Sequence, residues 1–161
     1  MGDRGYAGWL RRLSVVLAIV WMSVLFLLSG TPNLTLPISG PGFDKIYHAG
    51  AYGLLAVLFL AALQPDAKAG YRWPQVGLAI LLAGLYGVAD EWHQSFVPTR
   101  TPDVWDFAAD VTGAASGTLI VAAIVRRRLR IRLESREASA GNSTPGDSES
   151  RIQHSEYGRE E

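Results

Sequence analysis

The stretch LSVVLAIVWMSVLFLLSG, residues 13–30, contains no charged side chain. An α-helix of about 20 predominantly apolar residues crosses the hydrocarbon core of a bilayer, so this stretch predicts a membrane-spanning helix. The apolar residues that follow it also fall in long blocks instead of alternating with polar ones. This distribution favours a helical membrane protein over a soluble domain.

Three further blocks predict three more spans. Residues 46–63 form the second block, which ends where Gln64 and Pro65 stop the helix. The uncharged parts of the last two blocks are short, and they reach spanning length only by including acidic residues, over 74–97 and 103–125. We therefore predict an all-α polytopic membrane protein with a four-transmembrane-helix bundle.

The predicted transmembrane domain covers residues 13–125 and follows a short cytoplasmic segment, residues 1–12. Residues 126–161 are predicted to be a basic juxtamembrane segment and a disordered cytoplasmic tail. The last part, 134–161, is rich in Ser, Gly and Glu and nearly free of aliphatic residues. Such a composition buries too little apolar surface to offset the entropy of ordering the chain.

Lysine and arginine are concentrated on one side of the predicted bundle. Because basic residues favour the cytoplasmic side, this asymmetry places both termini in the cytoplasm and predicts a multi-pass protein of the cytoplasmic membrane. The expected environment is a lipid bilayer, and no nucleic-acid partner is expected. The basic residues on the cytoplasmic side are Arg4, Arg11, Arg12, Lys68, Arg72, Arg126, Arg127, Arg128, Arg130 and Arg132, against Lys45 and Arg100 on the other.

Polar motifs interrupt three of the apolar blocks. An ionisable group in hydrocarbon costs several kcal/mol unless it is paired or hydrated, so these motifs are the candidate functional residues. The predicted topology brings them to the outer face, and their spacing of four residues puts each set on one helix face. Glycines below the acids, Gly87, Gly113 and Gly117, predict close helix packing. The motifs are Asp44-Lys45-x-x-His48-x-x-x-Tyr52, Asp90-Glu91-x-x-Gln94 and Asp106-x-x-x-Asp110.

The charges of these motifs leave three interpretations open. In the first, Lys45, Arg100 and His48 pair with the acids and hold the spans together. The second interpretation starts from the excess of acids over fixed cations. It supplies the missing positive charge with a bound cationic molecule or with a divalent cation such as Mg²⁺ or Mn²⁺, which prefer to be coordinated by oxygen atoms. The third is a proton relay through protonated acids. The candidate metal ligands are Asp90, Glu91, Asp106, Asp110 and His48.

The three motifs, extended by Phe96-x-Pro98-x-Arg100 and by the glycines of the last block, resemble those of the VanZ-like family of small bacterial membrane proteins. The resemblance covers about residues 10–125. It implies a role in lowering sensitivity to the glycopeptide antibiotic teicoplanin, because the family is named for a resistance accessory protein. Asp110 stands where family members often carry Asn, which adds a negative charge to the site.

Two classes of function remain open, besides a purely structural cluster. The first is a non-enzymatic protein that binds an amphiphile at the outer face, such as a lipid-linked envelope precursor or a lipoglycopeptide. The second is an intramembrane metal-dependent enzyme acting on a lipid head group or lipid-linked precursor, with Asp90 or Glu91 as general base and His48 as acid or ligand. No nucleophile motif is present, so we favour the first. Its candidate ligand contacts are Asp44, Lys45, His48, Tyr52, Asp90, Glu91, Gln94, Arg100, Asp106 and Asp110.

Overall fold

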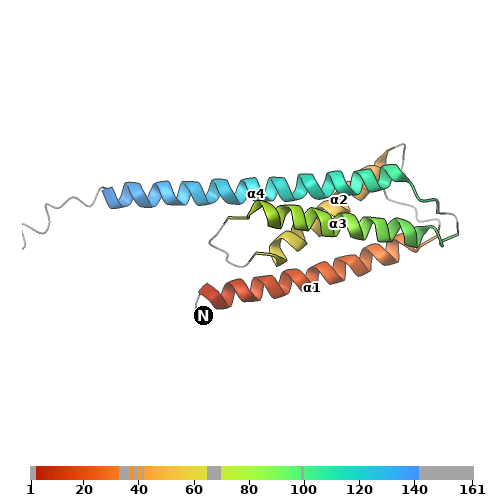
Figure 1. Cartoon of the computed structure of the whole chain (residues 1–161), viewed down its shortest axis with the longest axis horizontal. Helices are drawn as coiled ribbons and strands as arrows, with labels where there is room; N and C mark the ends of the chain where they lie inside the picture. Colours follow the sequence, from red (N-terminus) through yellow and green to blue (C-terminus); the bar gives the residue numbers. More distant parts are fainter. Residues whose placement is uncertain are drawn as a thin grey trace, which may run out of the picture. The chain divides into compact units, whose positions relative to one another are not determined.

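The computed structural model describes residues 3–32, 37, 40, 42–64, 70–98 and 100–141. Every regular element within these ranges is an α-helix, which confirms the predicted all-α class. Successive helices run in opposite directions, so the end of α1, the start of α2, the end of α3 and the start of α4 lie together (Figure 1). The helices are α1 (Asp3–Ser29), α2 (Phe43–Ala62), α3 (Trp73–Gln94) and α4 (Val104–Gly141).

Local sequence explains where the last three helices begin. Gly42 precedes α2 with a φ of 83°, a left-handed conformation that costs glycine little because it has no Cβ. Pro74 lies in the first turn of α3, where its missing N–H would have no helical partner. Asp103 caps α4, since its Oδ1 accepts a hydrogen bond from the backbone N–H of Trp105 at 2.9 Å.

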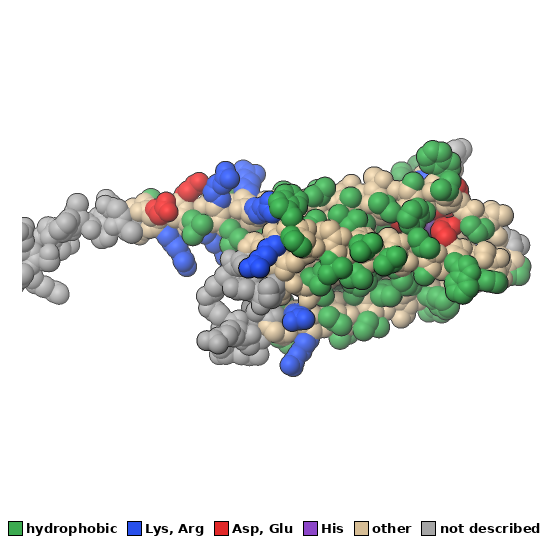
Figure 2. Space-filling model, viewed as in Figure 1, with side chains coloured by type: hydrophobic (Ala, Val, Ile, Leu, Met, Phe, Trp, Pro, Cys, Tyr) green, Lys and Arg blue, Asp and Glu red, His purple; other side chains and the backbone are tan. Residues whose placement is uncertain are grey.

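Three segments are long and apolar enough to cross a membrane: Gly8–Ser29, Phe43–Ala62 and Val104–Ser139. The outward surface supports a lipid environment, because many large apolar side chains are exposed along the helices (Figure 2). On α1, for example, Val16, Ile19 and Leu27 are more than half exposed. A water-soluble protein rarely exposes so much continuous apolar surface.

The chain divides into two compact units, residues 1–126 and residues 127–161. In the first unit α2 is the central element, and it packs against α4 through backbone contact. A Cβ added at Gly113 would collide with the backbone of Ala49, and one added at Gly117 would lie 2.9 Å from the carbonyl oxygen of Gly53. Small residues at this crossing therefore let the two helices approach closely.

The other helices of the first unit are joined to α2 and to one another by apolar clusters and by long-range hydrogen bonds. Leu25 of α1 packs with Tyr52 and Leu55 of α2 in one buried cluster. The indole N–H of Trp21 donates to the carbonyl of Ala51 at 2.9 Å, and the Tyr86 hydroxyl donates to the carbonyl of Met22 at 2.6 Å. These bonds fix α1 against both α2 and α3.

In the second unit, the described part is the last stretch of α4, through Gly141. This helix is longer than the sequence predicted, because the fourth span was expected to end at residue 125 and no helix was expected over residues 134–141. Its Arg, Leu and Glu residues favour helix formation, and no Gly or Pro interrupts them before Gly141. The remainder of the predicted tail, residues 142–161, lies outside the described residues.

Candidate functional site

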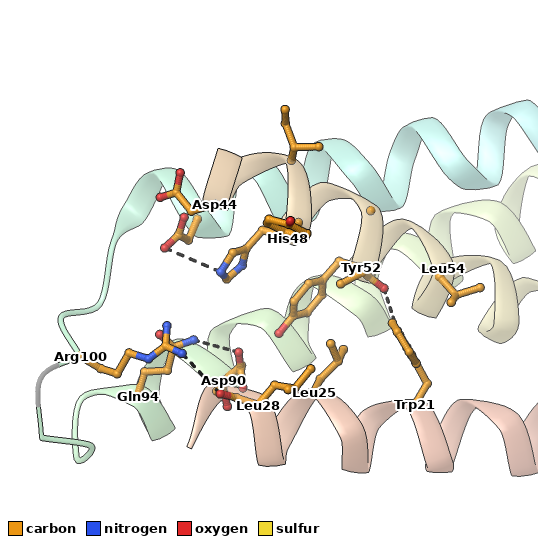
Figure 3. A pocket seen from close by; sticks show the side chains of 16 residues that line it. Trp21, Leu25, Leu28, Asp44, His48, Tyr52, Leu54, Asp90, Gln94 and Arg100 are labelled. Carbon is orange, nitrogen blue, oxygen red and sulfur yellow. Dashed lines mark hydrogen bonds and ion pairs between the residues drawn. The ribbon is translucent and has the colours of Figure 1, made fainter. Parts of the chain in front are cut away.

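The polar motifs of α2, α3 and α4 converge at one end of the first unit. Each side chain is positioned by a rigid helix, with the exception of Arg100, which lies between α3 and α4 (Figure 3). Asp44, Lys45, His48 and Tyr52 come from α2, Asp90, Glu91 and Gln94 from α3, and Asp106 and Asp110 from α4. The helices of the bundle thus bring together groups that are far apart in the sequence.

Lys45 organises the outer layer of this site. Its ammonium lies 2.6 Å from Asp103, 2.6 Å from Asp106 and 3.0 Å from Asp44. The hydrogen bond from Lys45 holds the pKa of Asp103 below its usual value, and the N–H of Trp105 acts in the same direction. One cation therefore compensates three carboxylates and ties the start of α2 to the start of α4.

His48 organises the inner layer. Its Nδ1 lies 2.9 Å from Oδ1 of Asp110, and its Nε2 lies 3.8 Å from Oδ2 of Asp106. Glu91 approaches from α3, because ligand atoms of His48, Glu91 and Asp110 all lie within 4.8 Å of one another. Oε2 of Glu91 accepts a hydrogen bond from the backbone N–H of Asp103 at 3.0 Å. The inner layer therefore joins three helices.

Several buried polar atoms of this inner region have no hydrogen-bond partner among the described residues. Among them are Oε1 of Glu91 and Oδ2 of Asp110, whereas the Tyr52 hydroxyl faces the Asp90 carboxylate. Asp90 is anchored through its Oδ2, which accepts a bond from the Gln94 amide at 3.1 Å. Buried polar groups are normally satisfied by protein groups or by ordered water, so these oxygens are the positions in the site with capacity to accept a further hydrogen bond or to ligate an ion.

Gly87 makes room for one of these carboxylates. A Cβ added at this position of α3 would lie 2.9 Å from Oδ2 of Asp110 and 3.4 Å from the ring of Tyr52. The backbone of α3 can therefore approach the Asp110 side chain, which is 1% exposed. Gly87 therefore leaves space for the Asp110 carboxylate, in addition to allowing α3 and α4 to pack closely.

A pocket of about 530 Å³ opens beside the cluster. Its polar end is formed by charged and polar side chains, among them His48, Asp90 and Arg100, and the apolar wall comes from α1 and α2 (Figure 3). The apolar lining residues are Trp21, Leu25, Leu28, Ile46 and Leu54. Pockets that combine a few placed polar groups with an apolar wall are typical binding sites for small molecules.

Two polar side chains lie apart from the ion-paired network. Arg100 makes no ion pair with a described carboxylate, and its guanidinium donates a long hydrogen bond of 3.4 Å to the carbonyl of Leu28. His93 faces α1, where its ring stacks on Phe26 with centroids 4.2 Å apart and its Nδ1 lies 3.4 Å from the Ser29 hydroxyl. Arg100 is thus available to an incoming ligand.

The role of Asp103 and the contribution of α1 were not among the features predicted from the sequence. Asp103 pairs with Lys45 and also contacts Glu91 through its backbone. Its position three residues before Asp106, on the same side of a helix start, is a pattern that could have indicated it. The pocket wall formed by Trp21, Leu25 and Leu28 had no comparable pattern, because these residues belong to a uniformly apolar stretch.

The fold and this site define a class: a small helical membrane protein with an acidic, histidine-containing pocket at one end of its bundle. A scan against protein families matches residues 14–126 to the VanZ/LLP1 family. The chain belongs to this family, which confirms the resemblance drawn from the sequence motifs.

One relative among curated proteins is an uncharacterized protein of Schizosaccharomyces pombe. It is 28% identical over 127 residues, which cover 78% of this chain and 73% of the relative. No solved structure matches the chain.

Proposed function

We propose that this protein binds the head group of a zwitterionic amphiphile in the pocket, at the outer face of the cytoplasmic membrane. The observation that carries the proposal is the division of the pocket lining into two parts. Charged side chains form one end, and apolar side chains of α1 and α2 form the remaining wall. An amphiphile has the same division, with a charged head and an acyl chain. The wall would take the chain and the polar end the head.

The proposal places α3 in the membrane as a fourth span. Four large apolar side chains of α3, Leu78, Leu81, Leu85 and Val88, are each 42–58% exposed along its length. In lipid such exposure is favourable, whereas in water it is costly. The helix has 22 residues, enough at 1.5 Å per residue to cross a core of about 30 Å.

The proposal also fixes the orientation of the bundle. Arg11, Arg12, Arg72 and Arg126 lie on the helix ends opposite the acidic site, as the antiparallel arrangement requires. Arg126 is held there by a hydrogen bond of 3.2 Å to the carbonyl of Tyr71 and by stacking over Trp73. Because basic residues favour the cytoplasmic side, both termini face the cytoplasm and the pocket faces outward.

The charges at the pocket favour a head group that carries both signs. Arg100 lacks a carboxylate partner, and a guanidinium binds phosphate or carboxylate groups well. Asp44 and Asp90 line the same pocket and would accept hydrogen bonds from an amine. A phosphoethanolamine head group and an amphiphilic glycopeptide both offer such a pair of charges.

Membership of the VanZ/LLP1 family supports a link to glycopeptide antibiotics. We propose that occupation of the pocket by a lipid-linked envelope precursor or by the lipoglycopeptide itself lowers sensitivity to teicoplanin. The relative in a yeast supports a ligand that occurs in membranes generally, which makes a phospholipid the first candidate.

The test is a binding titration of the full chain purified in detergent, with EDTA present throughout. Phosphatidylethanolamine, phosphatidylglycerol and teicoplanin are titrated separately by calorimetry. We expect phosphatidylethanolamine to bind at least about tenfold more tightly than phosphatidylglycerol, since only the former carries an amine. Arg100→Gln and Asp90→Asn should each weaken binding by about tenfold, equivalent to about 1.4 kcal/mol.

The matched control is Arg11→Gln, which removes an exposed arginine of α1 outside the pocket lining and should leave the affinity unchanged. Tighter binding of teicoplanin than of either phospholipid would identify the antibiotic as the ligand of the pocket. Equal affinity for all three compounds, or equal losses in the control and the pocket variants, would contradict the proposal.

One observation favours the second candidate, an intramembrane enzyme acting on a lipid head group. The imidazole of His48 lies 2.9 Å from Asp110, and one oxygen of Glu91 lies within 4.8 Å of ligand atoms of both residues. The Glu91 carboxylate could activate water as a general base, with His48 as the acid. Mass spectrometry of phosphatidylethanolamine after incubation with the protein separates the candidates, because a binding protein returns the lipid intact and an enzyme releases a fragment.

A further inference from the structure

The inner and outer layers of the acidic site differ in how their charge is compensated. In the outer layer Lys45 pairs with Asp44, Asp103 and Asp106. In the inner layer no described Lys or Arg makes an ion pair with Asp90, Glu91 or Asp110, and the basic group in contact with Asp110 is the imidazole of His48. The inner carboxylates therefore require positive charge from another source or must hold protons.

The inner side chains are arranged as ligands of one ion would be. One ligand atom from each of His48, Glu91 and Asp110 lies within 4.8 Å of the others. Two ligands of a single Mg²⁺ lie about 3–4 Å apart, because each metal–oxygen distance is about 2.1 Å. Small rotations of the side chains would bring the three atoms onto one ion.

The buried oxygens without partners point to the same conclusion independently. Oδ2 of Asp110 belongs to a side chain that is 1% exposed, and it has no hydrogen-bond partner among the described residues. Oε1 of Glu91 is also a buried atom without a partner among the described residues, although the Glu91 side chain as a whole is only half-buried. An unsatisfied carboxylate oxygen in so dry a place is costly, and coordination of a cation would satisfy it.

We propose that His48, Glu91 and Asp110 form a binding site for a divalent cation that joins α2, α3 and α4. One imidazole with two carboxylates is a mixed set of ligands. Carboxylates suit Mg²⁺ and Mn²⁺, whereas imidazole suits metals that are less hard, such as Zn²⁺. Mn²⁺ accepts both kinds of ligand and is the most suitable probe.

The site lies against one wall of the pocket. His48 lines the pocket, while Glu91 and Asp110 do not. A cation held here would neutralise the inner acids and would stabilise the contacts between three helices. This role is independent of the proposed amphiphile, so the two proposals can fail separately.

The experiment is a titration of the full chain with MnCl₂ alone. The protein is purified in detergent, stripped with EDTA and dialysed, and free Mn²⁺ is followed by electron paramagnetic resonance. We expect one Mn²⁺ per chain and a rise in the thermal unfolding midpoint when it binds. Glu91→Gln and Asp110→Asn should each weaken binding at least about tenfold, since loss of even a group that only supports a metal ligand costs about tenfold or more.

Glu91→Gln is the more informative variant if Asp110→Asn fails to fold, because a glutamine oxygen can still accept the N–H bond of Asp103. The matched control is Glu134→Gln, which removes an exposed carboxylate of α4 outside both the group and the pocket lining and should bind Mn²⁺ as the native chain does. Absence of stoichiometric Mn²⁺ from folded native protein would overturn the proposal. Equal weakening by Glu134→Gln and Glu91→Gln would overturn it too, since that result indicates diffuse attraction by surface acids.

Discussion

A single lysine, Lys45, compensates three acids at the mouth of the site, and its bond to Asp103 has a testable pH dependence. The pKa of Asp103 lies below its usual 3.8 in the folded chain because Lys45 donates to the carboxylate. This ion pair therefore stabilises the fold above the unfolded pKa and is lost as the pH falls through the lowered folded pKa.

We predict that Asp103→Asn lowers the thermal unfolding midpoint at pH 6 and that the difference from the native chain shrinks below about pH 3.8. Asparagine keeps the shape of the side chain and still caps α4, so the comparison isolates the charge. The measurement is circular dichroism of detergent-purified protein at several pH values. A difference that is the same at pH 6 and pH 3 would show that the ion pair is not responsible.

The residues of the site were partly predictable from the sequence. Ionisable groups at intervals of four within apolar blocks indicated His48, Asp90 and Asp110, because a chain rarely keeps such groups in hydrocarbon without using them. Asp103 was not predictable in the same way, since an aspartate before a helix is commonly only a cap. The pairing of particular atoms depends on helix rotation, which the spacing does not determine.

At the scale of the helices, the crossing of α2 and α4 depends on glycine. Gly113 lies against the backbone of Ala49, which cannot move aside as a flexible side chain could. We predict that Gly113→Ala destabilises the fold by about 1–3 kcal/mol, the usual cost of overpacking, and displaces the acids of α4 from His48. The measurement is the thermal unfolding midpoint together with the yield of monodisperse protein.

The matched control is Gly77→Ala on α3, where an added Cβ would meet no atom within 4 Å. It should be neutral or slightly stabilising, because alanine favours helix more than glycine does. Equal effects of the two substitutions would indicate that helix propensity matters here and the close crossing does not.

Hydropathy predicted that the chain is helical and where its apolar helices lie, but it predicted their ends less well. The end of α4 is the clearest case. A change from apolar to charged residues after Val125 marks where lipid contact would stop, yet backbone hydrogen bonds continue as long as the residues favour helix. Composition therefore predicts burial better than it predicts the last helical residue.

At the scale of the whole molecule, the proposed topology predicts which loops a membrane-impermeant reagent can reach. The chain has no cysteine. A single cysteine introduced at an exposed position is therefore the only thiol that a maleimide can label. Thr101→Cys should react with an impermeant maleimide in intact cells, whereas Ser135→Cys on α4 should react only after lysis. The reverse pattern would place the pocket on the cytoplasmic side, and reaction of both in intact cells would contradict the proposed arrangement.

The central claim is that the acids of separate helices meet His48 in one site, and cross-linking in native membranes tests it most directly. The chain carrying His48→Cys and Glu91→Cys is treated with a short bifunctional thiol reagent, beside a control carrying His48→Cys and Trp92→Cys. Trp92 follows Glu91 directly but is 69% exposed. We predict an intramolecular cross-link for the first pair and little for the second. Absence of a cross-link in the first pair, or equal yields in both, would contradict the account.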